Sequence, residues 1–125
     1  NVLKVKHVIV CGHYGCGGVK AALGNSSIGI IDNWIRHIKD VYRLHKDELD
    51  SITNEEDRFN TFVEVNVKEQ VFDLAKTSIV QNAWKNGQEL SLHGWVYGLN
   101  DGYVTDLGVN FSCDKDLDDV YQLKF

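Results

Sequence analysis

The sequence contains no proline, no methionine and only three cysteines among 125 residues. Three cysteines are an odd and sparse set, which excludes a complete disulfide framework and favours a reducing compartment and a cytoplasmic location. Proteins ordinarily contain about 5% proline, and its absence here has no functional interpretation. Because the chain starts at Asn1 without a methionine and enters an apolar strand almost at once, we expect a truncated start.

The sequence also lacks a charged and apolar leader and any long unbroken apolar segment. It therefore gives no indication of secretion or membrane insertion, although a leader could have been removed. The 13 Lys and Arg against 18 Asp and Glu give a net charge of −5, which argues against nucleic-acid binding because phosphate contacts need clustered cations. With 43% hydrophobic and 25% charged residues, the composition is that of one globular domain over residues 1–125.

The first half of the chain predicts a strand followed by helices. Residues 5–11 form a largely β-branched apolar run, interrupted by Lys6 and His7, which is typical of a strand buried on both faces of a parallel sheet. A short helix is expected over residues 19–23, and an amphipathic helix from Ile28 to Tyr42. The acidic residues 47–57 are interpreted as a loop or as the frayed start of the next helix.

Capping patterns predict two further helices. Asn66 followed by Glu69 is typical of an N-cap with a reciprocating acid, so a helix is expected to begin near Asn66. Thr77 or Ser78 can cap another helix, which Gly87 would end.

The remaining patterns complete an α/β fold. Residues 90–97 predict a strand, and the turn signal at residues 100–102 precedes a second strand over residues 103–107. A strand, helices and a hairpin in this order predict a mostly parallel sheet with helical crossovers and an antiparallel edge hairpin.

A glycine-rich turn, residues 12–18 (GHYGCGG), follows the first strand. It holds His13 and Cys16, and zinc accepts both imidazole nitrogen and thiolate sulfur. The glycines allow a tight bend, and the next helix directs its N-terminus at the turn. Cys11 is expected to point away from this pair and to pack as a small hydrophobe. By spacing alone, a tight turn with a buried thiol is the better explanation of the pattern.

The surrounding residues resemble a known family. Residues 8–19 (VIVCGHYGCGGV) resemble the second zinc-ligand motif of bacterial-type β-class carbonic anhydrases. Further blocks resemble the same family in the same order, up to about Gly108. These blocks are residues 30–38, 66–71, 78–84 and 92–97, the last followed by Asp101-Gly102.

The resemblance implies an activity and a ligand set. In this family, zinc takes two Cys and one His, and zinc-bound hydroxide reversibly hydrates carbon dioxide to bicarbonate. His13 and Cys16 match two ligands, and the Gly17 and Gly18 amides would favour the developing anion. The other Cys and a catalytic Asp–Arg pair belong to a Cys-x-Asp-x-Arg motif that nothing in this chain matches. We expect that motif upstream of Asn1, so that the chain alone would be inactive.

The resemblance also implies partners. The family predicts a homodimer or homotetramer, and the strand that carries the missing motif would pair beside residues 5–11. Without it, an apolar sheet edge would be exposed. Tyr97 matches a tyrosine of a separate bicarbonate pocket in a bicarbonate-inhibited bacterial subtype. The Trp and Arg that complete that pocket are absent from this sequence, which favours a core or hairpin role for Tyr97.

Other candidates have simpler interpretations. Tyr14 lies between the ligands and could line the cleft or belong only to the turn. The histidines are interpreted as structural, namely His7, His37, His45 and His93. Trp34 and Trp84 are interpreted as core or subunit-interface residues, and Cys113 has no partner by spacing.

Two other classes of protein remain open on the residues alone. A strand, a glycine-rich turn and a helix can bind a nucleotide phosphate, but Lys20 follows Val19 rather than the last glycine, and the dinucleotide pattern is not met. A non-catalytic interaction or regulatory domain that retains this half of the fold is the other alternative.

Overall fold

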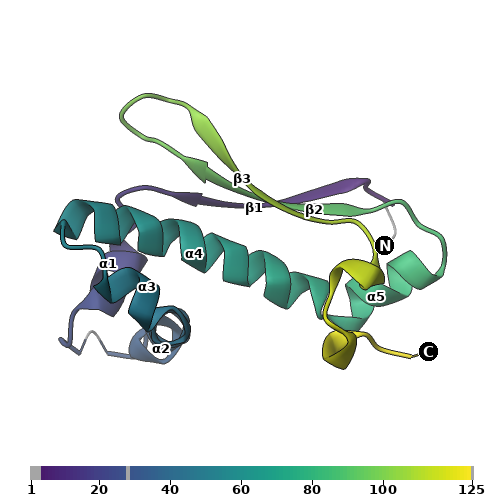
Figure 1. Cartoon of the computed structure of the whole chain (residues 1–125), viewed down its shortest axis with the longest axis horizontal. Helices are drawn as coiled ribbons and strands as arrows, with labels where there is room; N and C mark the ends of the chain where they lie inside the picture. The colour runs from purple at the N-terminus through teal and green to yellow at the C-terminus, as the bar shows by residue number, and fades with distance from the viewer. Residues whose placement is uncertain (1–3, 28, 125) are drawn as a thin grey trace.

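The computed structural model describes residues 4–27 and 29–124. In this part of the chain, three strands form one mixed sheet in the order β1-β2-β3 (Figure 1). β1 (His7–His13) and β2 (Ser91–Tyr97) are parallel, and β3 (Val104–Phe111) is antiparallel to β2. The predicted α/β class with an antiparallel edge hairpin is confirmed. Asn1 and Ile28, where predicted features began, lie outside the described residues.

Helices connect β1 to β2 and lie together on one side of the sheet (Figure 1). They are α1 (Gly17–Leu23), α2 (Asp32–Leu44), α3 (Lys46–Asp50), α4 (Glu55–Ala75) and α5 (Ser78–Lys85). After β3, two 3₁₀ turns, η1 (Asp114–Asp116) and η2 (Asp119–Tyr121), return the chain to α5. Within the described ranges, none of the helices combines the length and the apolar composition needed to span a bilayer.

α4 is the central helix of the core. Its Val67 packs against the sheet, where a Cβ built on Gly12 of β1 or on Gly94 of β2 would lie 2.6 or 3.3 Å from the nearer methyl of Val67. On another side of α4, the fully buried Phe62 packs edge-on against Tyr42 of α2, with ring centroids 5.2 Å apart. α4 is therefore buried between the sheet and the α1–α3 layer.

β1 is covered on one face only, which corrects the expectation of a strand buried on both. Val8 and Val10 are half-buried and pack against the core, whereas Ile9 is 41% exposed on the opposite face. The reason is that the described helices pack on one side of the sheet. β1 is also an edge strand of the described sheet, as the resemblance implied.

The expectation for Cys11 is wrong as well. Residues two apart in a strand point to the same face, so Cys11 shares the exposed face of β1 with His13. Its thiol is exposed rather than packed, and Sγ lies 3.5 Å from the carbonyl oxygen of Gly12.

α4 begins at Glu55, so the predicted start near Asn66 is wrong. The N-cap is Asn54, whose side chain accepts a hydrogen bond of 3.0 Å from the Asp57 amide. Asn66 instead lies inside the helix, and its Oδ1 is buried without a hydrogen-bond partner in the described part of the chain. The same pattern, Asn followed three residues later by an acid, occurs at Asn54 and at Asn66. Because apolar residues between these two positions are buried against the rest of the fold, the helix that begins after Asn54 continues through Asn66.

Other local predictions have mixed outcomes. Thr77 caps α5, as predicted, by accepting a hydrogen bond of 3.3 Å from the Val80 amide. The hairpin turn at residues 100–102 is also confirmed. Of the two interpretations of residues 47–57, the loop is wrong for residues 47–50, which belong to α3, whereas residues 55–57 form the start of the next helix, α4.

The tryptophans have different environments. Trp34 is 72% exposed at the start of α2, so it is not a core residue, and its predicted role at a subunit interface stays a prediction. Trp84 is half-buried in α5 and donates a hydrogen bond of 2.8 Å from Nε1 to the Leu90 carbonyl.

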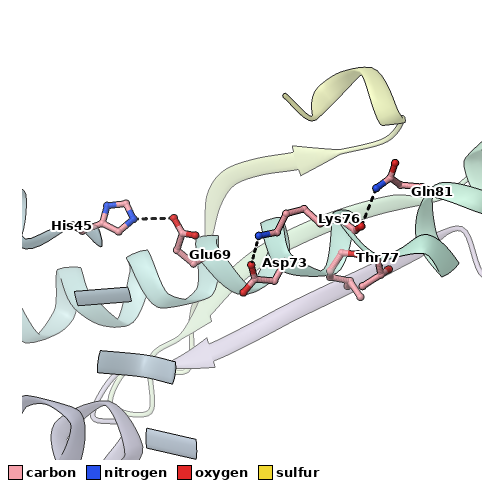
Figure 2. Close-up of polar contacts among 7 residues, drawn as sticks. His45, Glu69, Asp73, Lys76, Thr77 and Gln81 are labelled. Atoms are coloured by element: carbon pink, nitrogen blue, oxygen red, sulfur yellow. Dashed lines mark hydrogen bonds and ion pairs between the residues drawn. The ribbon is translucent and has the colours of Figure 1, made fainter. Parts of the chain in front are cut away.

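Polar contacts hold α4 to its neighbouring helices (Figure 2). His45, the C-cap residue of α2, places Nε2 2.9 Å from Glu69 Oε1 of α4. Within α4 itself, the C-cap residue Lys76 places Nζ 2.9 Å from Asp73 Oδ1. Gln81 of α5 donates from Nε2 to the Lys76 carbonyl at 2.9 Å. These contacts stabilise the helical layer along its length.

Candidate metal centre

The glycine-rich turn lies at the carboxyl end of β1, the end at which open parallel sheets bind ligands. His13 is the last residue of β1 and is in register with Tyr97, the last residue of β2. Gly15 has a φ of 76°, which favours glycine, and Cys16 is the N-cap residue of α1. The structure thus brings His13, Cys16 and Tyr97 to one end of the parallel strand pair.

The imidazole of His13 is oriented by its neighbour. Nδ1 lies 3.0 Å from the carbonyl oxygen of Tyr14. A carbonyl can only accept, so Nδ1 carries the hydrogen and Nε2 keeps its lone pair. Metal-binding histidines are ordinarily held in this way, with the second ring nitrogen donating to a carbonyl or carboxylate. The exposed His13 ring therefore presents Nε2 as a nitrogen ligand.

Cys16 lies where the turn becomes a helix. Its side chain is half-buried, and Gly18 lies beside the thiol: a Cβ built there would make an ordinary contact with Sγ at 3.9 Å. α1 begins at Gly17. The amides of Gly17 and Gly18 have no acceptor within the helix, because the first N–H groups of any helix lack one.

Tyr14 connects the turn to the core. Its amide donates to the Tyr97 carbonyl at 3.1 Å, and its hydroxyl donates to Glu64 Oε2 of α4 at 2.7 Å. Burial, followed by the hydrogen bond to Glu64, raises the pKa of Tyr14 to about 12, so the hydroxyl stays protonated at neutral pH. Sequence reasoning missed Glu64. The available signal was an acid placed within the largely apolar run of residues 62–67.

The donor set fits zinc in part. Imidazole nitrogen and thiolate sulfur are ligand types that zinc prefers, and His13 and Cys16 present both. Zinc sites ordinarily take three or four protein ligands, and residues 4–27 and 29–124 contain no cluster of three or more His, Cys, Asp or Glu that could hold a metal ion. These residues therefore fit as two ligands of a larger set.

The other histidines have structural contacts or lie apart from the turn. His93 is hydrogen-bonded, as predicted: its Nε2 lies 3.1 Å from Nδ1 of His7 on the neighbouring strand. His45 pairs with Glu69, and His37 is exposed on α2. Cys113 is a free, half-buried thiol.

Two cavities lie near the turn without including the ligand pair. One, of about 470 Å³, is lined by Tyr14, Gly15 and residues of the β2–β3 turn such as Asp101. Another, of about 620 Å³, is lined by residues of α1, α2 and α4 that include Lys20 and Arg58. Neither His13 nor Cys16 lines these two cavities.

Comparison with known proteins defines the family. The sequence matches the family described as carbonic anhydrase over residues 1–104, and the chain belongs to this family. It is 47% identical over 122 residues to a carbonic anhydrase of Emericella nidulans, with 97% of this chain and 54% of that protein covered. A carbonic anhydrase of Synechocystis is 30% identical, with 82% and 38% covered.

Solved structures identify the class as β. A Coccomyxa β-carbonic anhydrase in complex with acetazolamide superposes with a TM-score of 0.85 and 38% identity, covering 91% of this chain and 52% of that one. Tetrameric β-carbonic anhydrases of Sordaria macrospora give a TM-score of 0.78 and 33% identity, covering 88% and 56%. The chain spans about half the length of the relatives that it matches most extensively.

Proposed function

We propose that the whole protein containing this chain reversibly hydrates carbon dioxide to bicarbonate, with zinc held in part by His13 and Cys16. The observation that carries the proposal is the turn itself. In a chain of the β-carbonic anhydrase family, it pairs a thiol with an imidazole whose Nδ1 is already engaged by the Tyr14 carbonyl. The remaining Cys ligand and the Asp–Arg pair belong, in this proposal, to a segment upstream of Asn1.

The residues of this chain would bind the metal and orient the reaction. His13 would bind through Nε2, and Cys16 through its thiolate, the form in which cysteine binds metals. Zinc, when bound, lowers the pKa of a coordinated water to about 7 and so supplies a nucleophile near neutral pH. The amides of Gly17 and Gly18 would donate hydrogen bonds to the anion that develops beside Cys16.

Tyr97 belongs to the proposal as a residue that could contact a second bicarbonate. It lies at the end of β2, in register with His13, and is half-buried on the sheet face opposite α4. Because the chain lacks the Trp and Arg partners of the bicarbonate-inhibited subtype, a packing role at the hairpin is the competing explanation. Inhibition by bicarbonate that is unchanged in Tyr97→Phe would remove the second site from the proposal.

The metal assignment is tested in the whole protein. We expect His13→Ala and Cys16→Ala each to lose bound zinc and carbon dioxide hydration, because zinc would retain too few ligands. Zinc content is measured by elemental analysis and hydration by stopped-flow pH change.

Matched substitutions outside the turn control for nonspecific effects. His37→Ala and Cys113→Ser remove the same functional groups from α2 and from the start of η1, and they are expected to keep zinc and activity. Unchanged zinc and activity in either turn variant would disprove the ligand assignment. A whole protein that binds no zinc would instead support the non-catalytic interpretation.

Assembly and location complete the proposal. We infer a homodimer or homotetramer, supported by the tetrameric state named for the Sordaria relatives and by the uncovered face of the described sheet. Sedimentation of the whole protein tests this. The free cysteines Cys11, Cys16 and Cys113 support a reducing, cytoplasmic compartment, which cell fractionation tests.

A further inference from the structure

In the glycine-rich turn, Tyr14 is anchored to the core through both its backbone and its side chain. Its amide donates to the Tyr97 carbonyl of β2 and its hydroxyl donates to Glu64 of α4, while its carbonyl oxygen lies 3.0 Å from Nδ1 of His13. The carbonyl that orients the imidazole therefore belongs to a residue held from two different elements.

Beside Tyr14, two glycines of the turn make no packing contacts of their own. A Cβ built on Gly15 or on Gly17 would meet no atom within 4 Å, so neither position packs against the core. Gly15 also lacks a side chain to restrict its backbone. The position of the Tyr14 carbonyl therefore depends on the anchors of Tyr14 itself.

Glu64 is an unusual residue to find at its position in α4. It is half-buried between Val63 and Val65, which are 2% and 5% exposed. A half-buried carboxylate is partly desolvated, which costs free energy unless it is hydrogen-bonded. Its Oε2 accepts the 2.7 Å hydrogen bond from Tyr14, across 50 positions of sequence.

We propose that Glu64 is a positioning residue for the zinc ligand His13 and acts through Tyr14. The Glu64 carboxylate holds the Tyr14 ring, the Tyr14 carbonyl holds Nδ1–H of His13, and Nε2 is thereby directed toward the metal. This inference rests on the proposed function, since it requires zinc at His13. It adds a residue of the central helix that contacts neither the metal nor the substrate.

The test measures metal binding by the whole protein. Removing a group that hydrogen-bonds a metal ligand typically lowers metal affinity by about 10- to 100-fold. We therefore expect Glu64→Ala and Tyr14→Phe each to weaken zinc binding by up to about that factor, measured in competition with a chromophoric chelator. The double variant should lose no more than the larger single variant, because both changes break one chain of contacts. Glu64→Gln retains an acceptor oxygen and should restore most of the affinity.

A spectroscopic measurement separates positioning from general destabilisation. In the cobalt-substituted protein, Glu64→Ala and Tyr14→Phe should shift the visible absorption bands, because the ligand geometry changes. Glu69→Ala is the matched control. Glu69 is another half-buried glutamate of α4, hydrogen-bonded to His45 at 2.9 Å and away from the turn. This control should leave both the cobalt bands and the zinc affinity unchanged.

The outcomes distinguish this inference from the proposed function. If His13→Ala loses zinc while Glu64→Ala and Tyr14→Phe keep the wild-type affinity and cobalt bands, the positioning role is overturned and the metal assignment stands. Equal losses in Glu64→Ala and Glu69→Ala would also overturn it. If Glu64→Ala does not fold, Tyr14→Phe, which removes a single oxygen atom, decides alone. If His13→Ala keeps its zinc, the proposed function and this inference both fail.

Discussion

Gly12 of β1 and Val67 of α4 meet where the sheet packs on its central helix, and a Cβ atom at Gly12 would lie 2.6 Å from Cγ2 of Val67. Real Cβ atoms do not approach other atoms so closely, so only glycine permits this separation of strand and helix. Gly12 is also the first residue of the ligand turn. The close approach of β1 to α4 therefore sets the position of the turn relative to the helix that carries Glu64.

Gly12→Ala is expected to destabilise the protein by about 1–3 kcal/mol, the usual cost of overpacking a core. Val67→Ala removes the methyl groups that the new Cβ would meet, so the double variant should be more stable than the sum of the two single effects predicts. Urea unfolding of all three variants measures the coupling free energy. If the two changes in the free energy of unfolding simply add, the new Cβ at position 12 is accommodated by movement of other parts of the structure rather than by Val67.

Gly17→Ala is the matched control for this prediction. A Cβ at Gly17 would meet nothing within 4 Å, and the residue lies in α1, where alanine favours the helix. Its stability should therefore equal or exceed that of the wild type.

Elements with local determinants could be predicted from the sequence. Thr77 caps α5 with its own side chain, and the Asn100–Gly102 turn produces the hairpin, so neighbouring residues contain all the required information. α4 is different, because its apolar residues face both the sheet and α2, which obscures the helical period. The N-cap pattern at Asn66 was then misleading, since burial rather than capping decides that this segment continues the helix.

The candidate site divides in the same way. His13 and Cys16 are close in sequence and could be identified from one motif, whereas the contact between Tyr14 and Glu64 joins residues 50 apart and depends on how α4 lies against β1. The exposed face of β1 could not be predicted for a related reason. A β-branched run indicates a strand, but which faces are covered depends on the helices that pack there.

Gln81 anchors the C-terminal segment, and its loss should release that segment. The side chain is fully buried; Nε2 donates to the carbonyls of Lys76 and Tyr121, and Oε1 accepts from the Leu123 amide, all within 2.9 Å (Figure 2 shows the Lys76 contact). Gln81→Leu leaves these groups unpaired, which should cost on the order of 2–4 kcal/mol. Hydrogen exchange should show loss of protection at the Leu123 amide.

The control for Gln81 is its exposed neighbour on α5, Asn82. Asn82→Leu adds the same apolar side chain without removing the buried contacts, so stability and Leu123 protection should remain near the wild-type values. Protection at Leu123 that survives in Gln81→Leu would show that other contacts hold the segment.

The ion pair between Lys85 of α5 and Asp114 of η1 should contribute stability that depends on pH. Nζ and Oδ2 are 2.7 Å apart, and the hydrogen bond from Lys85 lowers the pKa of Asp114 below its ordinary value of 3.8. A lowered pKa in the folded state gives stability that is present above the ordinary value and lost as the pH falls through the lowered one. Lys85→Gln should therefore be less stable at neutral pH, by up to about 1 kcal/mol.

The pH dependence provides the decisive comparison. In acid below the lowered pKa of Asp114, wild type and Lys85→Gln should have the same free energy of unfolding, because Asp114 is protonated in both. Lys68→Gln removes an equal charge from an exposed position on α4. The difference between its free energy of unfolding and that of the wild type should be the same at neutral pH and in acid. A difference between wild type and Lys85→Gln that persists in acid would mean that packing of the lysine stem, rather than charge, is responsible.

Trp34 should contribute to self-association rather than to folding. Its side chain is 72% exposed at the start of α2, beside Ile30 and Ile31, which are 92% and 44% exposed. Exposed apolar groups of this kind mark interaction surfaces, so Trp34→Ser should weaken the oligomer in sedimentation while leaving the unfolding midpoint of the dissociated subunit unchanged. Val120→Ser changes a residue that is 82% exposed near the C-terminal end and serves as the control, with no effect on assembly. An oligomer of wild-type strength in Trp34→Ser would place the subunit interface elsewhere, leaving the uncovered face of β1 as the next surface to test.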